Sequence, residues 1–147
     1  MYIHSIKNAG LALAIAAAAL VGCQSESQMG GKTAMKATLA ASQEVPPNAS
    51  RGTGTGTFNF DPATKQLQYN VTYSGLTGPA TAAHIHGPAA PGAVAPPWIP
   101  FQNPTSPITG TATLTDAQVQ ALNNGQTYVN IHTAANPAGE IRGQITK

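Results

Sequence analysis

Charged and aromatic residues are scarce in this 147-residue chain. Asp, Glu, Lys and Arg together make up only 8% of it, and the formal net charge is +2. Proteins that bind nucleic acid carry a clustered basic face, so this composition argues against nucleic acid as a partner. Aromatic residues make up 5%, so a core must be built mainly from smaller residues such as Val, Ile, Thr and Ala.

The sequence also lacks a cysteine pair and a long hydrophobic run. Cys23 is the only cysteine, so the fold does not depend on an intramolecular disulfide. The apolar run at residues 9–21 is shorter than the ~20 residues that a transmembrane helix needs. Lys7 precedes this run and no acidic residue does, which is typical of a secretory signal peptide.

The apolar run ends in Leu20-Val21-Gly22-Cys23, which resembles the lipobox of bacterial lipoproteins. The resemblance implies that residues 1–22 are a signal peptide and that Cys23 is acylated. Residues 23–35 then form the lipidated cysteine and a flexible tether. The lipid anchors the protein to a membrane of the bacterial envelope, and the domain faces the periplasm or the cell exterior. Gln24 after the cysteine resembles a signal for sorting to the outer membrane, and the outer membrane is therefore favoured. The alternative is an ordinary secreted protein with a chance cysteine.

The rest of the chain, residues 36–147, is expected to form one domain of short strands. The clearest strand is 66–74, where Leu67 and Val71 alternate with polar residues. Further strands are predicted at residues 36–42, 53–60, 81–86, 108–114, 127–133 and 140–146. Thr115 is expected to cap one short helix at 116–122. These elements predict an all-β fold, an antiparallel Greek-key sandwich or barrel of about seven to eight strands with one short helix.

A long segment rich in Pro and Ala, residues 87–107, is predicted to be a loop without strands of its own. It carries Trp98 and Phe101, whose large apolar side chains are candidates for contact with a partner. The alternative is that Trp98 folds back as a lid over one end of the barrel.

Three histidines remain after removal of the signal peptide, and all of them fall in predicted strands. His84 and His86 are two residues apart, so both point away from the face that carries Ile85. His132 has the same relation to Ile131. If the two strands are neighbours, the three imidazoles converge outside the core and suit Cu or Zn, with an open coordination position. The alternative is three surface histidines without a ligand.

Four blocks of the sequence resemble the CHRD domain, a family named after chordin and widespread in bacterial envelope proteins. The blocks are Gln43-Glu44-Val45-Pro46-Pro47, Ala83-His84-Ile85-His86-Gly87, Tyr128-Val129-Asn130-Ile131-His132-Thr133 and Gly139-Glu140-Ile141-Arg142-Gly143-Gln144. The resemblance covers nearly all of the predicted domain. It does not extend the growth-factor antagonism of chordin to a bacterial lipoprotein.

A looser similarity is to copper–zinc superoxide dismutase, in which a His-x-His strand and a later Val-x-His strand supply copper ligands. By this similarity His84, His86 and His132 are metal ligands, and Arg142 corresponds to an arginine that faces the incoming anion. Asn130, which has the parity of His132, is expected beside the site. The sequence has no bridging histidine, no further zinc ligands and no disulfide pair, which leaves at most a mononuclear site.

Three functions are compatible with these residues. The favoured one is an envelope protein that binds a metal ion through the three histidines, with Cu preferred and Zn as the alternative. The second is a structural or adhesive module that binds an unknown envelope partner through the outer sheet face or the Trp98 segment. The third is copper-dependent dismutation of superoxide, for which Arg142 would be the only cationic guide of the anion. Hydrolysis is less favoured still, because no carboxylate pair is evident, so a non-enzymatic role is preferred.

Overall fold

The structure is a computed structural model that describes residues 31–147. Its strands are β1 (Thr33–Ala40), β2 (Thr53–Asp61), β3 (Gln66–Ser74), β4 (Ala80–His86), β5 (Pro97–Pro100), β6 (Ile108–Thr113), β7 (Tyr128–Thr133) and β8 (Ile141–Gln144). A 3-10 helix, η1, spans Ala41–Gln43, and one α-helix, α1, spans Asp116–Asn123. No helix of this described part is long and apolar enough to cross a membrane.

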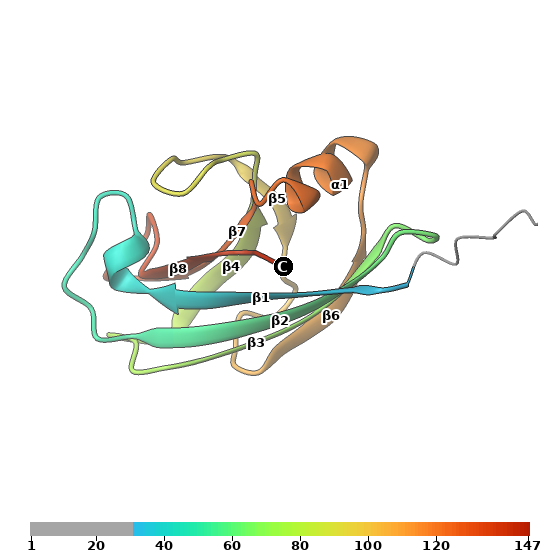
Figure 1. The fold of residues 1–147 in the computed structure, drawn as a ribbon. Coiled ribbons are helices and arrows are strands. Elements are labelled where there is room, and N and C mark those ends of the chain that lie inside the picture. The colour runs from blue at the N-terminus through green and yellow to red at the C-terminus, as the bar shows by residue number, and fades with distance from the viewer. Residues whose placement is uncertain (1–30) are drawn as a thin grey trace, which may run out of the picture.

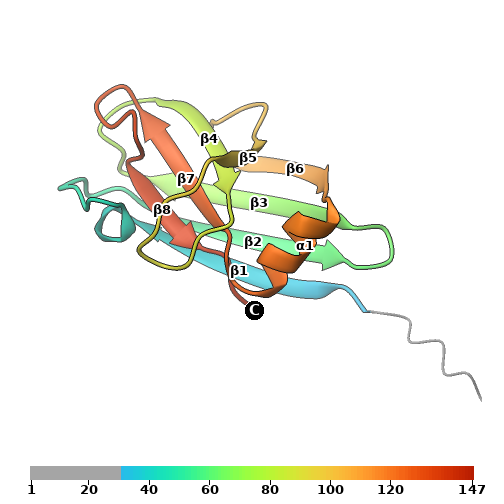
Figure 2. The same cartoon turned by 90° about the horizontal axis from the view of Figure 1, so that it is seen from above.

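The eight strands form one antiparallel sheet that nearly closes into a barrel. Their order is β5-β4-β7-β8-β1-β2-β3-β6, so β5 and β6 are the two outer strands. Figures 1 and 2 show β1, β2 and β3 in one layer, with β4, β7 and β8 crossing over them and α1 at one end. The predicted all-β fold with antiparallel strands and one short helix is confirmed.

Alternation along the strands places one face of each strand in the core. On β2 every second residue from Gly54 to Phe60 is buried, and the intervening residues are exposed. The absence of a side chain at Gly56 leaves room for the Phe58 ring, two atoms of which lie 2.7 and 2.8 Å from the place that a Cβ would take. The aliphatic side chains that are fully buried include Leu39, Leu67, Val71, Ile85, Val129, Ile131, Ile141 and Ile145.

Several element boundaries differ from the predictions. β1 begins at Thr33, so Met35 is buried in the core instead of belonging to a tether. The segment predicted as a bare loop contains β5, because Ile99 can pair with Ile85 on β4. The two prolines of β5 are tolerated since it is an edge strand. The predicted signal peptide, Cys23 and the tether up to residue 30 lie outside the described residues.

The helix begins where the sequence predicts. The backbone N–H of Gln118 donates to Thr115 Oγ1 at 3.3 Å, and the backbone N–H of Thr115 donates to Gln118 Oε1 at 2.9 Å. This reciprocal pair satisfies two backbone donors at the helix start. The predicted cap at Thr115 is therefore confirmed.

The connection between β4 and β5, residues 87–96, folds back across the outer face of β7 and β8 (Figure 2). We call it the covering loop. Gln144 Nε2 donates to Ala89 O at 2.9 Å, and Arg142 Nη1 donates to Ala93 O at 2.9 Å. Side chains of β8 thus hold the loop through its carbonyl groups. As a result, polar side chains on this face of the sheet are buried although they point away from the core.

Candidate metal site

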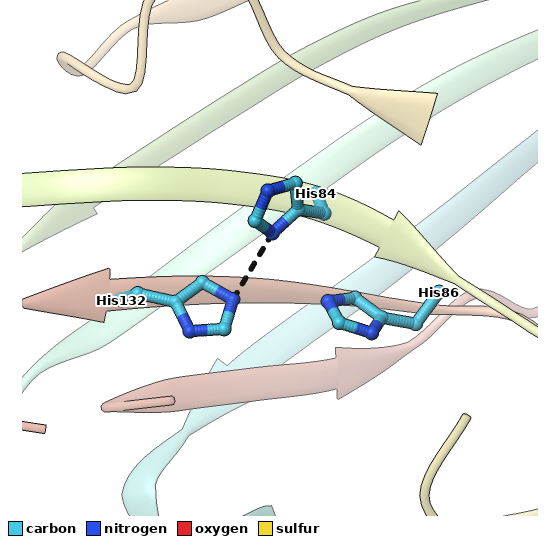
Figure 3. Close-up of side chains that lie close together, drawn as sticks. All are labelled: His84, His86 and His132. Atoms are coloured by element: carbon cyan, nitrogen blue, oxygen red, sulfur yellow. Dashed lines mark hydrogen bonds between the residues drawn. The ribbon is translucent and has the colours of Figure 1, made fainter. Parts of the chain in front are cut away.

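The pairing of β4 with β7 brings the three predicted histidines together. In this antiparallel register Ala82 lies opposite His132, His84 opposite Asn130 and His86 opposite Tyr128. The three imidazoles therefore share the face turned away from the core, as Figure 3 shows. One nitrogen from each ring lies within 4.8 Å of the other two. This spacing is compatible with three ligands of one metal ion.

Backbone carbonyl groups fix the protonation of two of the imidazoles. His86 Nδ1 lies 2.9 Å from Ala95 O, and His132 Nδ1 lies 3.0 Å from Pro137 O. A carbonyl oxygen only accepts hydrogen bonds, so we assign the proton to Nδ1 in both rings and a lone pair to both Nε2 atoms. Metal-binding histidines commonly use such a carbonyl contact on the nitrogen that does not bind the metal.

The nitrogens with lone pairs face one another. His86 Nε2 is buried and has no hydrogen-bond partner among the described residues. His132 Nε2 lies 3.1 Å from His84 Nδ1, the contact drawn as a dashed line in Figure 3. Here the Nδ1–H of His84 donates to His132. If that proton moves to the other nitrogen of His84, all three facing nitrogens can bind a cation.

Electrostatics favour neutral imidazoles. Burial lowers the pKa of His84, His86 and His132 below the usual 6.5. The hydrogen bond to Ala95 acts to raise the pKa of His86, and the hydrogen bond to Pro137 acts to raise the pKa of His132. The charge of His132 lowers the pKa of His84 further. The three rings are therefore uncharged at neutral pH, which is the form that binds metal.

Access to the cluster is from the side of His84. His86 is 7% exposed and His132 is 9% exposed, whereas His84 is only half-buried. The covering loop closes the site over His86, because Ala95 accepts from that imidazole. The cluster is therefore most open to solvent at His84.

Arg142 and Asn130 lie on the same face as the histidines and opposite each other on β8 and β7. The Arg142 guanidinium lies 3.6 Å from the centroid of the Tyr128 ring, which in turn stacks on His86 with centroids 4.8 Å apart. Arg142 is only 2% exposed. Arg142 thus contacts Tyr128 and the covering loop, and the expectation that it faces an incoming anion stays a prediction.

Glu44 is a buried carboxyl that sequence reasoning did not assign to the site. It follows η1, and its Oε1 has no hydrogen-bond partner in the described part of the chain. Burial raises the pKa of Glu44 to about 7, although the charge of Arg142 and the amide of Asn130 act to lower it. No histidine lies near Glu44 along the chain, so spacing did not connect it with the site. The one feature of the sequence that pointed to Glu44 was its place in the block Gln43-Glu44-Val45-Pro46-Pro47, which resembles the CHRD domain.

A second carboxyl, Glu140, holds the end of the sheet next to the site. Its carboxylate accepts five hydrogen bonds: from Ser50 Oγ, the backbone N–H and Oγ1 of Thr77, Thr133 Oγ1 and Asn136 Nδ2. Burial by itself would raise the pKa of Glu140, but these donors hold it at about 2. Asn136 belongs to the same turn as Pro137, whose carbonyl orients His132. Glu140 therefore supports one of the metal-ligand candidates.

The two aromatic candidates for partner contact lie in different surroundings. Phe101 is buried in the core and stacks on Tyr69 with centroids 4.5 Å apart, so its ring is not available at the surface. Trp98 on β5 is half-buried beside α1. Its ring packs over Gly87, where a Cβ would lie 2.8 Å from it. Cys23 is outside the described residues.

Comparisons with known proteins identify one family. The family model of the CHRD domain matches residues 35–145, which include all three histidines, Glu44 and Arg142. No curated protein and no solved structure matches the chain. The match spans most of the sequence and nearly all of the described fold. The chain therefore belongs to the CHRD-domain family.

Proposed function

We propose that this CHRD-domain protein binds a single metal ion, copper in preference to zinc, through Nδ1 of His84 and Nε2 of His86 and His132. One observation carries the proposal. His86 Nε2 is buried, is assigned a lone pair and lacks a hydrogen-bond partner among the described residues, yet it faces two other imidazoles. A buried polar atom without a partner is costly, and a bound cation would satisfy it.

The chemistry of the donor set supports copper or zinc. The cluster offers three imidazoles and no carboxylate or thiolate. Imidazole suits both ions, whereas calcium and magnesium prefer oxygen ligands. Three protein ligands leave a coordination position for water or a small substrate. Ala95 and Pro137 would hold two of the rings in the binding tautomer.

The test uses the expected mature chain, residues 23–147, with Cys23→Ser to prevent acylation. Metal content, equilibrium dialysis with Cu(II) and Zn(II), and electron paramagnetic resonance of the copper form would be measured. We expect one ion per chain with nitrogen hyperfine splitting. His86→Gln should weaken binding by more than about 100-fold, while Asn70→Ala on the exposed face of β3 is the matched control. Equal binding by both variants would exclude the site.

A second candidate function is an interaction module. Val94 is 68% exposed on the covering loop, and Val45 is 40% exposed. Together with Pro47 and Pro91, Val45 lines a surface groove. Exposed apolar side chains beside a groove are typical of a protein contact. Crosslinking in intact cells that depends on Val94 or Trp98, but not on the histidines, would favour this function.

We also propose that the protein is held in the bacterial envelope by acylated Cys23. The support is the sequence Leu20-Val21-Gly22-Cys23 after an apolar run of signal-peptide length. Incorporation of an alkyne-labelled fatty acid should be lost in Cys23→Ser. Fractionation of the labelled protein would then distinguish the favoured outer membrane from the inner one. Labelling that persists in the variant would exclude the anchor.

A further inference from the structure

The donors of the candidate site carry no charge of their own. Its three donors are neutral imidazoles, so they bring no negative charge to balance the ion. A buried cation that is not balanced carries a large desolvation cost, and that cost grows with the charge of the ion. The preference of such a site between ions of different charge therefore depends on the other charges around it.

A fixed positive charge lies behind one of the ligands. Arg142 stacks on Tyr128 at 3.6 Å, and Tyr128 stacks on His86 with the rings 13° from parallel. Arg142 is 2% exposed, and its Nη2 is buried without a partner among the described residues. Solvent therefore screens this charge poorly.

The nearby carboxyls balance Arg142 incompletely. Glu44 faces it but forms no ion pair with it, since the ion pair found in the described chain joins Lys65 and Asp116. With a pKa of about 7, Glu44 is only partly ionised at neutral pH. The charge of Glu140 is satisfied by five donors at the end of the sheet. A net positive potential thus remains beside the histidines.

We propose that Arg142, acting through Tyr128 on His86, makes the three-histidine site prefer the cuprous ion over the divalent ions of copper and zinc. This inference rests on the proposed metal site. A single charge on the order of 10 Å away, in a medium with an effective dielectric constant of about 20, changes an equilibrium constant roughly tenfold. Arg142 therefore acts as a residue that sets the charge preference of the site without binding the metal.

The experiment measures affinities for Cu(I), Cu(II) and Zn(II) in the mature chain with Cys23→Ser. Ascorbate supplies the single electron that reduces Cu(II) to Cu(I), and a chromophoric chelator competes for each ion. Arg142→Gln removes the charge, and Arg142→Lys keeps it. We expect Arg142→Gln to shift the ratio of Cu(I) to Cu(II) affinity about tenfold towards Cu(II), which is about 59 mV for a one-electron couple. Zn(II) should bind more tightly to the same variant, and Arg142→Lys should stay close to the wild type.

Glu44→Gln is a second variant, whose effect on the affinity ratio should have the opposite sign. It keeps the test possible if circular dichroism shows that Arg142→Gln does not fold. Removing the partial negative charge should shift the affinity ratio towards Cu(I) at pH 8. An unchanged ratio in every folded variant, or a lysine variant that behaves like glutamine, would overturn the inference while leaving the metal site intact. Failure of the wild type to bind copper would instead overturn the proposed function and this inference together.

Discussion

Replacing Glu140 by glutamine tests how the end of the sheet beside His132 is stabilised. The variant keeps the shape of the side chain but removes the charge that accepts five hydrogen bonds. The pKa of Glu140 is about 2, compared with 4.5 for a free glutamate. One pKa unit corresponds to about 1.4 kcal/mol, so the shift sets an upper value of roughly 3 kcal/mol. Several of the donors are only partly buried, so we expect a loss of about 2 kcal/mol at pH 7.

The stabilisation by Glu140 should depend on pH in a defined direction. The pKa of Glu140 is lower in the folded than in the unfolded chain, so the unfolded chain binds more protons between the two values and stability rises with pH there. The contribution is fully present above pH 4.5 and is lost as the pH falls towards 2. The difference between wild type and Glu140→Gln should therefore shrink by more than half between pH 7 and pH 3.

Urea unfolding followed by the fluorescence of Trp98, the only tryptophan, measures this difference. Glu44→Gln is the matched control because its carboxyl has the opposite shift, to about 7. A pKa that is raised on folding stabilises the protein at a pH below the pKa of the unfolded chain, and this stabilisation is lost as the pH rises through 7. The free energy of unfolding of Glu44→Gln should therefore rise relative to that of the wild type at high pH. Equal stability of Glu140→Gln and wild type at pH 7, or a difference that does not change with pH, would refute the reasoning.

Three further predictions concern the site and the core. Copper binding should persist below pH 6.5 and be lost only as the pH falls through the lowered pKa values of the histidines, because protonated imidazole cannot bind metal; loss of binding already above pH 6.5 in a dialysis series would contradict this. Gly139→Ala should destabilise the fold by about 1–3 kcal/mol, since its φ is 139° and a Cβ would lie 2.5 Å from Asn130 Oδ1; an unchanged midpoint of thermal unfolding would count against the close packing. Phe101→Ala should cost about 3 kcal/mol because the ring is buried against Tyr69, and a cost below about 1 kcal/mol in urea unfolding would mean that the ring is not part of the core.

The sequence determined those features that depend on neighbouring residues. Alternation of apolar and polar residues in β3 and the Thr115 cap of α1 were readable because side-chain direction and capping are set within a few residues. The same parity placed His84, His86 and His132 on the face opposite Ile85 and Ile131. Composition also indicated a core of small apolar residues. The position of β5 was missed, because its pairing with β4 depends on a contact between Ile85 and Ile99 rather than on local pattern.

The tertiary structure decided what these side chains meet. Sequence parity could place the histidines on one face, but only the pairing of β4 with β7 brought their nitrogens within 4.8 Å. Only the return of the covering loop buried that face and supplied Ala95 to orient His86. The stack of Arg142, Tyr128 and His86 likewise joins three strands. Such contacts link residues far apart in the chain, and their geometry depends on strand order and loop path, which local sequence patterns do not encode.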